Sequence, residues 1–143
     1  MVLLATGLTL NRENTAYLLY AEPHGDGKIV SKSVAIVDYG TGNIASLDQA
    51  FAAIGASAFL ASTPNQLLAA DAVVLPGVGH FGPASHALVS SGLGSELCRL
   101  LQAGLPCLGI CLGFQLLTRS SAEAPGQPGL GLLPLHTVRI APT

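Results

Sequence analysis

The chain is poor in charged residues. Only 10% of its 143 residues are Asp, Glu, Lys or Arg, whereas an ordinary soluble domain has about 25%. Half of the residues are apolar. A surface with so little charge is typical of a chain that a partner covers, or of one that forms part of a larger folded unit.

Basic clusters and long apolar runs are also missing. The formal net charge is −2, and nucleic acids and acidic membrane surfaces bind concentrated positive charge, so we expect neither as a partner. No uninterrupted apolar stretch reaches the about 18 residues that cross a bilayer. The apolar residues 2–10 lack a preceding positive residue and a convincing cleavage site, so they do not indicate a signal peptide.

Cysteine is scarce and its spacing is uninformative for metals. Cys98, Cys107 and Cys111 form an odd set without a CxxC pair. This pattern indicates neither a disulfide framework nor a zinc site. It fits a reducing compartment, so we predict a cytoplasmic protein without a metal or a cofactor.

The chain divides into an extension and one domain. Residues 1–33 are polar and irregular, and we expect an N-terminal extension of uncertain order there. Residues 34–143 alternate short apolar runs with helix-like patterns, which predicts an α/β domain with an open, mostly parallel sheet and helices on both faces. Strands are predicted over 34–37, 57–61, 72–75, 106–110 and 137–140. Helices are predicted after Asn43, which can cap the first of them, after 63, around 84–89 and over 93–103.

The most informative motif is Gly109-Ile110-Cys111-Leu112-Gly113, at the end of the fourth predicted strand. Glycine two residues to each side of a cysteine is the thiol form of a nucleophile elbow, in which small residues allow a sharp strand-to-helix turn. The start of a helix favours a thiolate over a thiol. A buried structural thiol is the alternative, and the paired glycines favour the nucleophile.

Two glycine-rich turns follow other predicted strands. Gly40-Thr41-Gly42-Asn43 fits the start of a dinucleotide-binding pattern, but no acidic residue follows the second strand, so a tight turn is the better interpretation. Pro76-Gly77-Val78-Gly79 follows the third strand and should lie at the same sheet edge as Cys111. There it could supply a second oxyanion contact.

A nucleophilic cysteine normally needs a histidine base. We find no convincing base position among His24, His80, His86 and His136. His80 and His86 are expected to be surface or capping residues.

Four segments in order resemble one family: 38–43, 75–81, 109–117 and 129–134. Their sequences are DYGTGN, LPGVGHF, GICLGFQLL and GLGLLP. This set resembles the glutaminase subunits of imidazole glycerol phosphate synthase, which are class I, triad-type glutamine amidotransferases of histidine biosynthesis with a flavodoxin-like fold. The similarity runs from Val34 to about Pro134.

The resemblance implies a role for each matching residue. Cys111 would attack the side-chain amide of glutamine, and the backbone amides of Val78 and Leu112 would form the oxyanion hole. The substrate would be held by Gly77, Gln115 and Glu123. The resemblance also implies a heterodimer with a cyclase subunit, which would receive the ammonia, with Thr41 and Asn43 at the interface.

The chain departs from the family pattern in three places. Phe114 replaces the usual methionine, and residues 1–33 precede the usual start. The sequence ends at Thr143, before the segment in which the family carries its catalytic His-Pro-Glu, so activity as it stands is doubtful. Two alternatives therefore stay open: a non-catalytic remnant that binds the cyclase, and another triad glutaminase, of the anthranilate or pyridoxal phosphate synthesis type.

Overall fold

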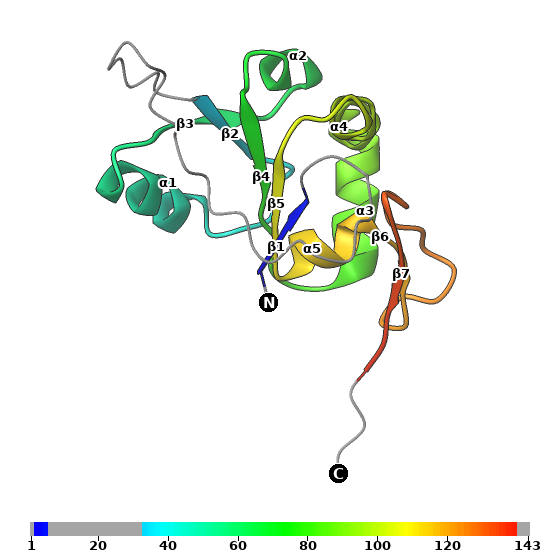
Figure 1. Cartoon of the computed structure of the whole chain (residues 1–143). Helices are drawn as coiled ribbons and strands as arrows, with labels where there is room; N and C mark the ends of the chain where they lie inside the picture. The colour runs from blue at the N-terminus through cyan, green and yellow to red at the C-terminus, as the bar shows by residue number, and fades with distance from the viewer. Residues whose placement is uncertain (1, 6–32, 140–143) are drawn as a thin grey trace, which may run out of the picture.

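The computed structural model describes residues 2–5 and 33–139 of the chain (Figure 1). They form a five-stranded sheet, a separate pair of strands and five helices. In chain order the elements are β1 Val2–Ala5, β2 Ser33–Val37, α1 Ile44–Ala53, β3 Ser57–Ala61, α2 Pro64–Leu67, β4 Ala72–Leu75, α3 Phe81–Ser90, α4 Leu93–Gln102, β5 Cys107–Ile110, α5 Leu112–Leu117, β6 Thr118–Ser121 and β7 Leu133–Thr137.

The order of the main sheet is β1-β5-β4-β2-β3. Strands β3, β2, β4 and β5 are mutually parallel, and only β1 runs antiparallel, along β5. The first parallel strand, β2, therefore has β3 on one side and β4 on the other, which is the winding of a flavodoxin-like sheet. In this winding, ligands bind beyond the carboxyl ends of the strands, near the point where the order reverses.

The buried strands explain why the sheet forms. Strand β4 is buried along its whole length, and so are the last four residues of β2. Continuous burial requires cover on both faces. On one face, Phe51 of α1 packs with Val34, Ile36 and Val74. The opposite face carries the larger apolar cluster, which includes residues of α2, α3, α4 and α5. Figure 1 shows α1 on one side of the sheet and α3, α4 and α5 on the other.

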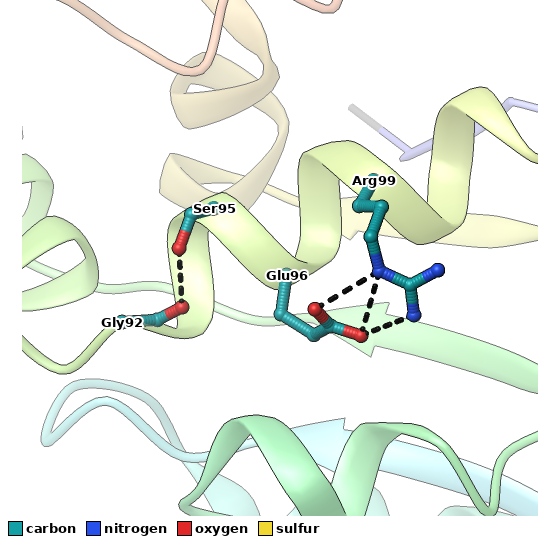
Figure 2. A network of polar contacts seen from close by, with 4 residues as sticks. All are labelled: Gly92, Ser95, Glu96 and Arg99. Carbon is teal, nitrogen blue, oxygen red and sulfur yellow. Dashed lines mark hydrogen bonds and ion pairs between the residues drawn. The ribbon is translucent and has the colours of Figure 1, made fainter.

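Helix α4 shows how an amphipathic sequence selects its face. Leu93, Leu97 and Leu101 recur every four residues and are buried, which is the spacing of one helical stripe. Ser95 and Arg99 of the same helix are exposed and Glu96 is half-buried; Figure 2 shows their polar contacts. There Ser95 Oγ donates to the Gly92 carbonyl at 2.9 Å. The Arg99 guanidinium pairs with the carboxylate of Glu96, three residues earlier.

The predicted fold class is confirmed, while several boundaries differ. Residues 2–5 of the expected extension form β1, and residues 6–32 lie outside the described part of the chain. The last strand was predicted over 137–140 but occurs at Leu133–Thr137, where Pro134 is tolerated because β7 pairs along one side only. Strand β6 was not predicted. It begins directly after α5, where Thr118 Oγ1 donates to the Gln115 carbonyl at 2.7 Å.

Candidate active site

Cys111 lies at a sharp turn between β5 and α5. Its backbone has φ 53° and ψ −112°, and it is the one non-glycine residue with positive φ in the described part of the chain. Such a conformation costs on the order of 1–3 kcal/mol and is concentrated at functional sites. Cys111 is exposed. The alternative of a buried structural thiol therefore does not describe this residue.

The two glycines beside Cys111 allow α5 to pack on the strands without side chains in between. A Cβ on Gly113 would lie 1.8 Å from the Leu75 carbonyl oxygen. A Cβ on Gly109 would lie 2.8 Å from Phe114 Cα. Both contacts are with backbone atoms, which cannot move aside as a flexible side chain could. The glycine spacing that identifies the elbow in the sequence thus has a direct steric cause.

The Pro76–Gly79 turn lies against the start of α5. A Cβ on Gly77 would be 2.8 Å from the Gly113 nitrogen and 2.9 Å from Leu112 Cβ. The turn follows β4, which pairs directly with β5. Cys111 and this turn therefore meet at the carboxyl edge of the sheet. Val78, within the turn, is 56% exposed.

Tyr39 makes a buried hydrogen bond to the Pro76–Gly79 turn. Its hydroxyl donates to the Pro76 carbonyl at 2.7 Å, in a buried contact that joins the end of β2 to the end of β4. Burial raises the pKa of the Tyr39 hydroxyl, and the nearby Thr41 hydroxyl offsets part of that shift. The sequence pattern alone does not predict this contact of Tyr39. The available signal was an aromatic residue with a polar end, two positions after a buried strand.

The Gly40–Asn43 loop stands beside this turn. A Cβ on Gly42 would lie 3.2 Å from Pro76 Cβ. Asn43 Oδ1 accepts from the Ser46 backbone N–H at 3.4 Å and so caps α1, as predicted. Thr41 is half-buried. Its hydroxyl oxygen is buried and makes no hydrogen bond of good geometry among the described residues, although it lies close enough to the Tyr39 hydroxyl to lower the pKa of that group.

The two residues predicted to hold the substrate occupy different settings. Gln115 is half-buried in α5, four residues after Cys111, so the two lie on the same side of the helix. Glu123 lies in the turn after β6, and its carboxylate accepts from the Phe81 backbone N–H at 3.3 Å. His80 Nδ1 lies 3.1 Å from the other oxygen of Glu123. Sequence analysis did not foresee this pairing, because the residues are 43 positions apart.

In the described part of the chain, no histidine is hydrogen-bonded to Cys111. His80 pairs with Glu123, and His86 lies beside Ser90 on the next turn of α3. His136 Nδ1 lies 2.7 Å from Ser120 Oγ, across the β6–β7 pair. His24 is outside the described residues. The described residues therefore contain the candidate nucleophile but place no base beside it.

The other two thiols are not comparable to Cys111. Burial raises the pKa of Cys107 to about 12, and it also raises the pKa of the half-buried Cys98. Within residues 2–5 and 33–139, no three His, Cys, Asp or Glu side chains converge on a point that could hold a metal ion. Across those same residues, no helix has the length and apolar character needed to cross a membrane.

Comparison with known proteins agrees with the geometry. A curated relative, imidazole glycerol phosphate synthase subunit HisH of Methanothermobacter thermautotrophicus, is 50% identical over 109 residues, which cover 76% of this chain and 54% of the relative. The protein of the same name from Gloeobacter violaceus is 51% identical over 102 residues, covering 71% of this chain and 45% of the relative. The chain thus spans about half the length of the curated relatives it matches.

A solved structure supports the fold alone. It is described as a crystal structure of glutamine amidotransferase, and it superposes with a TM-score of 0.63 at 21% identity, covering 74% of this chain and 56% of that one.

Residues 30–141 match the family described as the CobB/CobQ-like glutamine amidotransferase domain. That match covers well over half of the sequence. The chain therefore belongs to the glutamine amidotransferase family.

Proposed function

We propose that this chain acts as the glutaminase subunit of an imidazole glycerol phosphate synthase. It would hydrolyse glutamine at Cys111 and pass the ammonia to a cyclase subunit for histidine biosynthesis. One observation carries the proposal: an exposed cysteine with a strained backbone, seated against a glycine turn at the carboxyl edge of the sheet. The similarity to the HisH relatives selects this subunit among the glutaminases.

The chemistry begins with the Cys111 sulfur. The thiolate attacks the side-chain amide carbon of glutamine, and a sulfur–carbon bond forms while the carbonyl oxygen becomes an anion. Collapse of this intermediate breaks the carbon–nitrogen bond, and the nitrogen leaves as ammonia after taking a proton. Water then hydrolyses the thioester to glutamate. In this scheme the backbone amides of Leu112 and Val78 stabilise the oxyanion, a contribution that is typically large.

Gln115 and Glu123 would hold the α-amino and α-carboxylate groups of the substrate glutamine. A carboxylate such as that of Glu123 suits the α-ammonium group of glutamine. Its side chain is 41% exposed, so a ligand can reach the carboxylate. Gln115 offers an amide with both a donor and an acceptor. Gly77 allows the Pro76–Gly79 turn to lie against the start of α5, because any larger residue there would collide with that helix, and we assign its backbone to the substrate site.

The proton acceptor is the component that the described residues do not provide. Loss of a positioned base typically costs 10²–10⁴-fold in rate. For this reason a chain that binds the cyclase without catalysing remains a second candidate function. The anthranilate and pyridoxal phosphate glutaminases are less well supported, because the relatives cited above are HisH proteins.

The partner surface would include the Gly40–Asn43 loop. This loop lies beside the Pro76 turn, so a cyclase subunit docked there would stand next to the site that releases ammonia. Thr41 and Asn43 are the residues we assign to this interface. A cytoplasmic location and a domain spanning residues 34–143 are part of the same proposal.

Thiol protection tests the proposal on the chain itself. Iodoacetamide should alkylate Cys111 near neutral pH, and L-glutamine should slow that alkylation while D-glutamine does not. Cys107 is an internal control, because burial raises its pKa to about 12 and leaves it protonated. Equal alkylation of Cys111 with and without saturating L-glutamine would refute the proposal.

A second measurement separates catalysis from binding alone. After incubation with L-glutamine and an acid quench, intact mass should show a glutamyl adduct that Cys111→Ala removes. Protection by L-glutamine without any adduct or released glutamate would favour the non-catalytic, cyclase-binding function.

A further inference from the structure

The carboxylate of Glu123 is held by two donors from the start of α3. Its Oε1 lies 3.1 Å from His80 Nδ1, and its Oε2 accepts from the Phe81 backbone N–H at 3.3 Å. In the tautomer that carries its proton on Nδ1, His80 is a donor. Each carboxylate oxygen thus has one internal donor, which fixes the plane of the group.

The backbone that carries Glu123 is seated independently of His80. The Glu123 backbone N–H donates to Ser121 Oγ at 3.2 Å. Further along the same turn, Ser85 Oγ of α3 donates to the Pro128 carbonyl at 2.6 Å. Ala124 Cβ would lie 3.5 Å from a Cβ on Gly82, which is ordinary packing distance. Loss of the His80 side chain would therefore free the carboxylate while the turn stays in place.

His80 directly follows the glycine turn beside the proposed nucleophile. It occupies the N-cap position of α3, yet its side chain caps no backbone N–H of that helix. The imidazole is instead committed to Glu123 while remaining 83% exposed. A side chain so exposed contributes little packing, so the contact with Glu123 is the interaction that fixes its direction.

The carboxylate keeps the capacity to bind a ligand. An ionised carboxylate offers about four acceptor sites, and the two internal donors use two of them. With 41% of its side chain exposed, Glu123 can still accept hydrogen bonds from an ammonium group. A carboxylate fixed before the ligand arrives binds more tightly, because its rotamers need not be ordered on binding.

We propose that His80 is a positioning residue that orients Glu123 to receive the α-ammonium group of glutamine. The proposal rests on the proposed function, which assigns glutamine as substrate and Glu123 as part of its site. His80 takes no part in the bond changes at the amide. It would act on recognition of the amino-acid head and not on the reactivity of the Cys111 thiol.

The test uses a matched pair of reagents on the intact chain. The first is a chloromethyl ketone that carries the α-amino-acid head of glutamine, and the second is its analogue with hydrogen in place of the amino group. Either reagent alkylates Cys111 in one step, in which the sulfur–carbon bond forms, the carbon–chlorine bond breaks and chloride leaves. Mass spectrometry gives the second-order labelling rate, and the ratio of the two rates measures recognition of the ammonium group.

Three variants define the expected result. His80→Ala should lower the rate ratio by about tenfold, with the rate for the analogue without the amino group unchanged. His80→Asn, whose amide nitrogen can replace Nδ1 as a donor, should restore most of the ratio. His86→Ala, which removes an exposed histidine from the same helix, should leave the ratio unchanged.

The outcomes separate this inference from the proposed function. A wild-type chain that reacts equally with both reagents would overturn the assignment of glutamine, and this inference with it. A wild-type preference that His80→Ala fully retains would overturn the role of His80 alone. His80→Ala should also have no further effect once Glu123→Gln is present, and an additive loss in the double variant would equally contradict the proposal.

Discussion

At the scale of single residues, Cys111 combines exposure with an unfavourable backbone conformation. A positive φ of 53° with ψ of −112° is accessible to glycine but strained for any residue with a Cβ. The surrounding structure maintains this conformation, because Gly109 and Gly113 have no side chains and so allow α5 to pack closely on the strands. Packing thus offsets the strain, and the strained turn leaves the Cys111 thiol exposed.

Replacing Cys111 should show the strain directly. Cys111→Ala keeps a Cβ and therefore the strain, whereas Cys111→Gly removes both. Relief of about 1–3 kcal/mol, less about 0.5–1 kcal/mol for the greater freedom of glycine in the unfolded chain, leaves Cys111→Gly more stable by about 1 kcal/mol. Urea unfolding of the two variants gives this difference. An alanine variant as stable as the glycine variant would show that the turn is not strained.

Residues with local signals were predictable, and residues with distant partners were not. The glycine spacing around Cys111 predicted the elbow, and Asn43 predicted a helix cap. The Tyr39–Pro76 and His80–Glu123 contacts join residues 37 and 43 positions apart. Nothing in the local sequence marks such pairs, because they depend on how separate strands and helices are brought together.

At the scale of elements, the site depends on how closely α5 approaches the sheet. Its six residues, Leu112–Leu117, are too few to be stable as an isolated helix. Packing against β4 and β5 must supply its stability. Apolar runs predicted the parallel strands β2, β4 and β5. Strands β2 and β4 are buried almost throughout, whereas buried and half-buried residues alternate along β5. Strand β6 escaped prediction because Thr118–Ser121 is polar and its order comes from pairing with β7.

A methyl group at Gly113 should separate α5 from β4. In Gly113→Ala the new Cβ would lie 1.8 Å from the Leu75 carbonyl oxygen, so backbone must shift. We expect a loss of at least about 3 kcal/mol in the free energy of unfolding, at the upper end of overpacking costs. Gly82→Ala, in helix α3 with 3.5 Å of clearance, is the matched control. It should change stability by less than about 1 kcal/mol, and in the stabilising direction.

Thermal and chemical unfolding compare the two variants. A Gly113→Ala chain as stable as Gly82→Ala would mean that α5 can move away from β4 at little cost. The packing argument for the elbow would then fail.

At the scale of the whole molecule, the loops that follow β2 and β4 converge at one edge of the sheet. The Gly40–Asn43 loop, the Pro76 turn and Cys111 come from three separate strands. The winding of the sheet, with neighbours added on both sides of β2, brings their carboxyl ends together. The low charge content predicts a covered surface. This edge, where Gly42 approaches Pro76 and Val78 is exposed, is the surface that we propose for the cyclase.

Thr41 offers a test in which stability and binding should change in opposite directions. Its hydroxyl oxygen is buried and makes no hydrogen bond of good geometry among the described residues, although it lies close enough to the Tyr39 hydroxyl to lower the pKa of that group, and a poorly satisfied buried hydroxyl is costly. Thr41→Val has the same shape without that oxygen, so it should raise the free energy of unfolding by about 1 kcal/mol. If the hydroxyl finds its partner across the interface, the same variant should bind a cyclase subunit about tenfold more weakly, because a polar group of the partner is then left unpaired. Urea unfolding measures the first effect and titration calorimetry the second.

Val89→Ala, at an exposed position on α3, is the control for binding. Thr41→Val with lower stability would show that the hydroxyl is satisfied within the chain, and unchanged affinity would remove Thr41 from the interface.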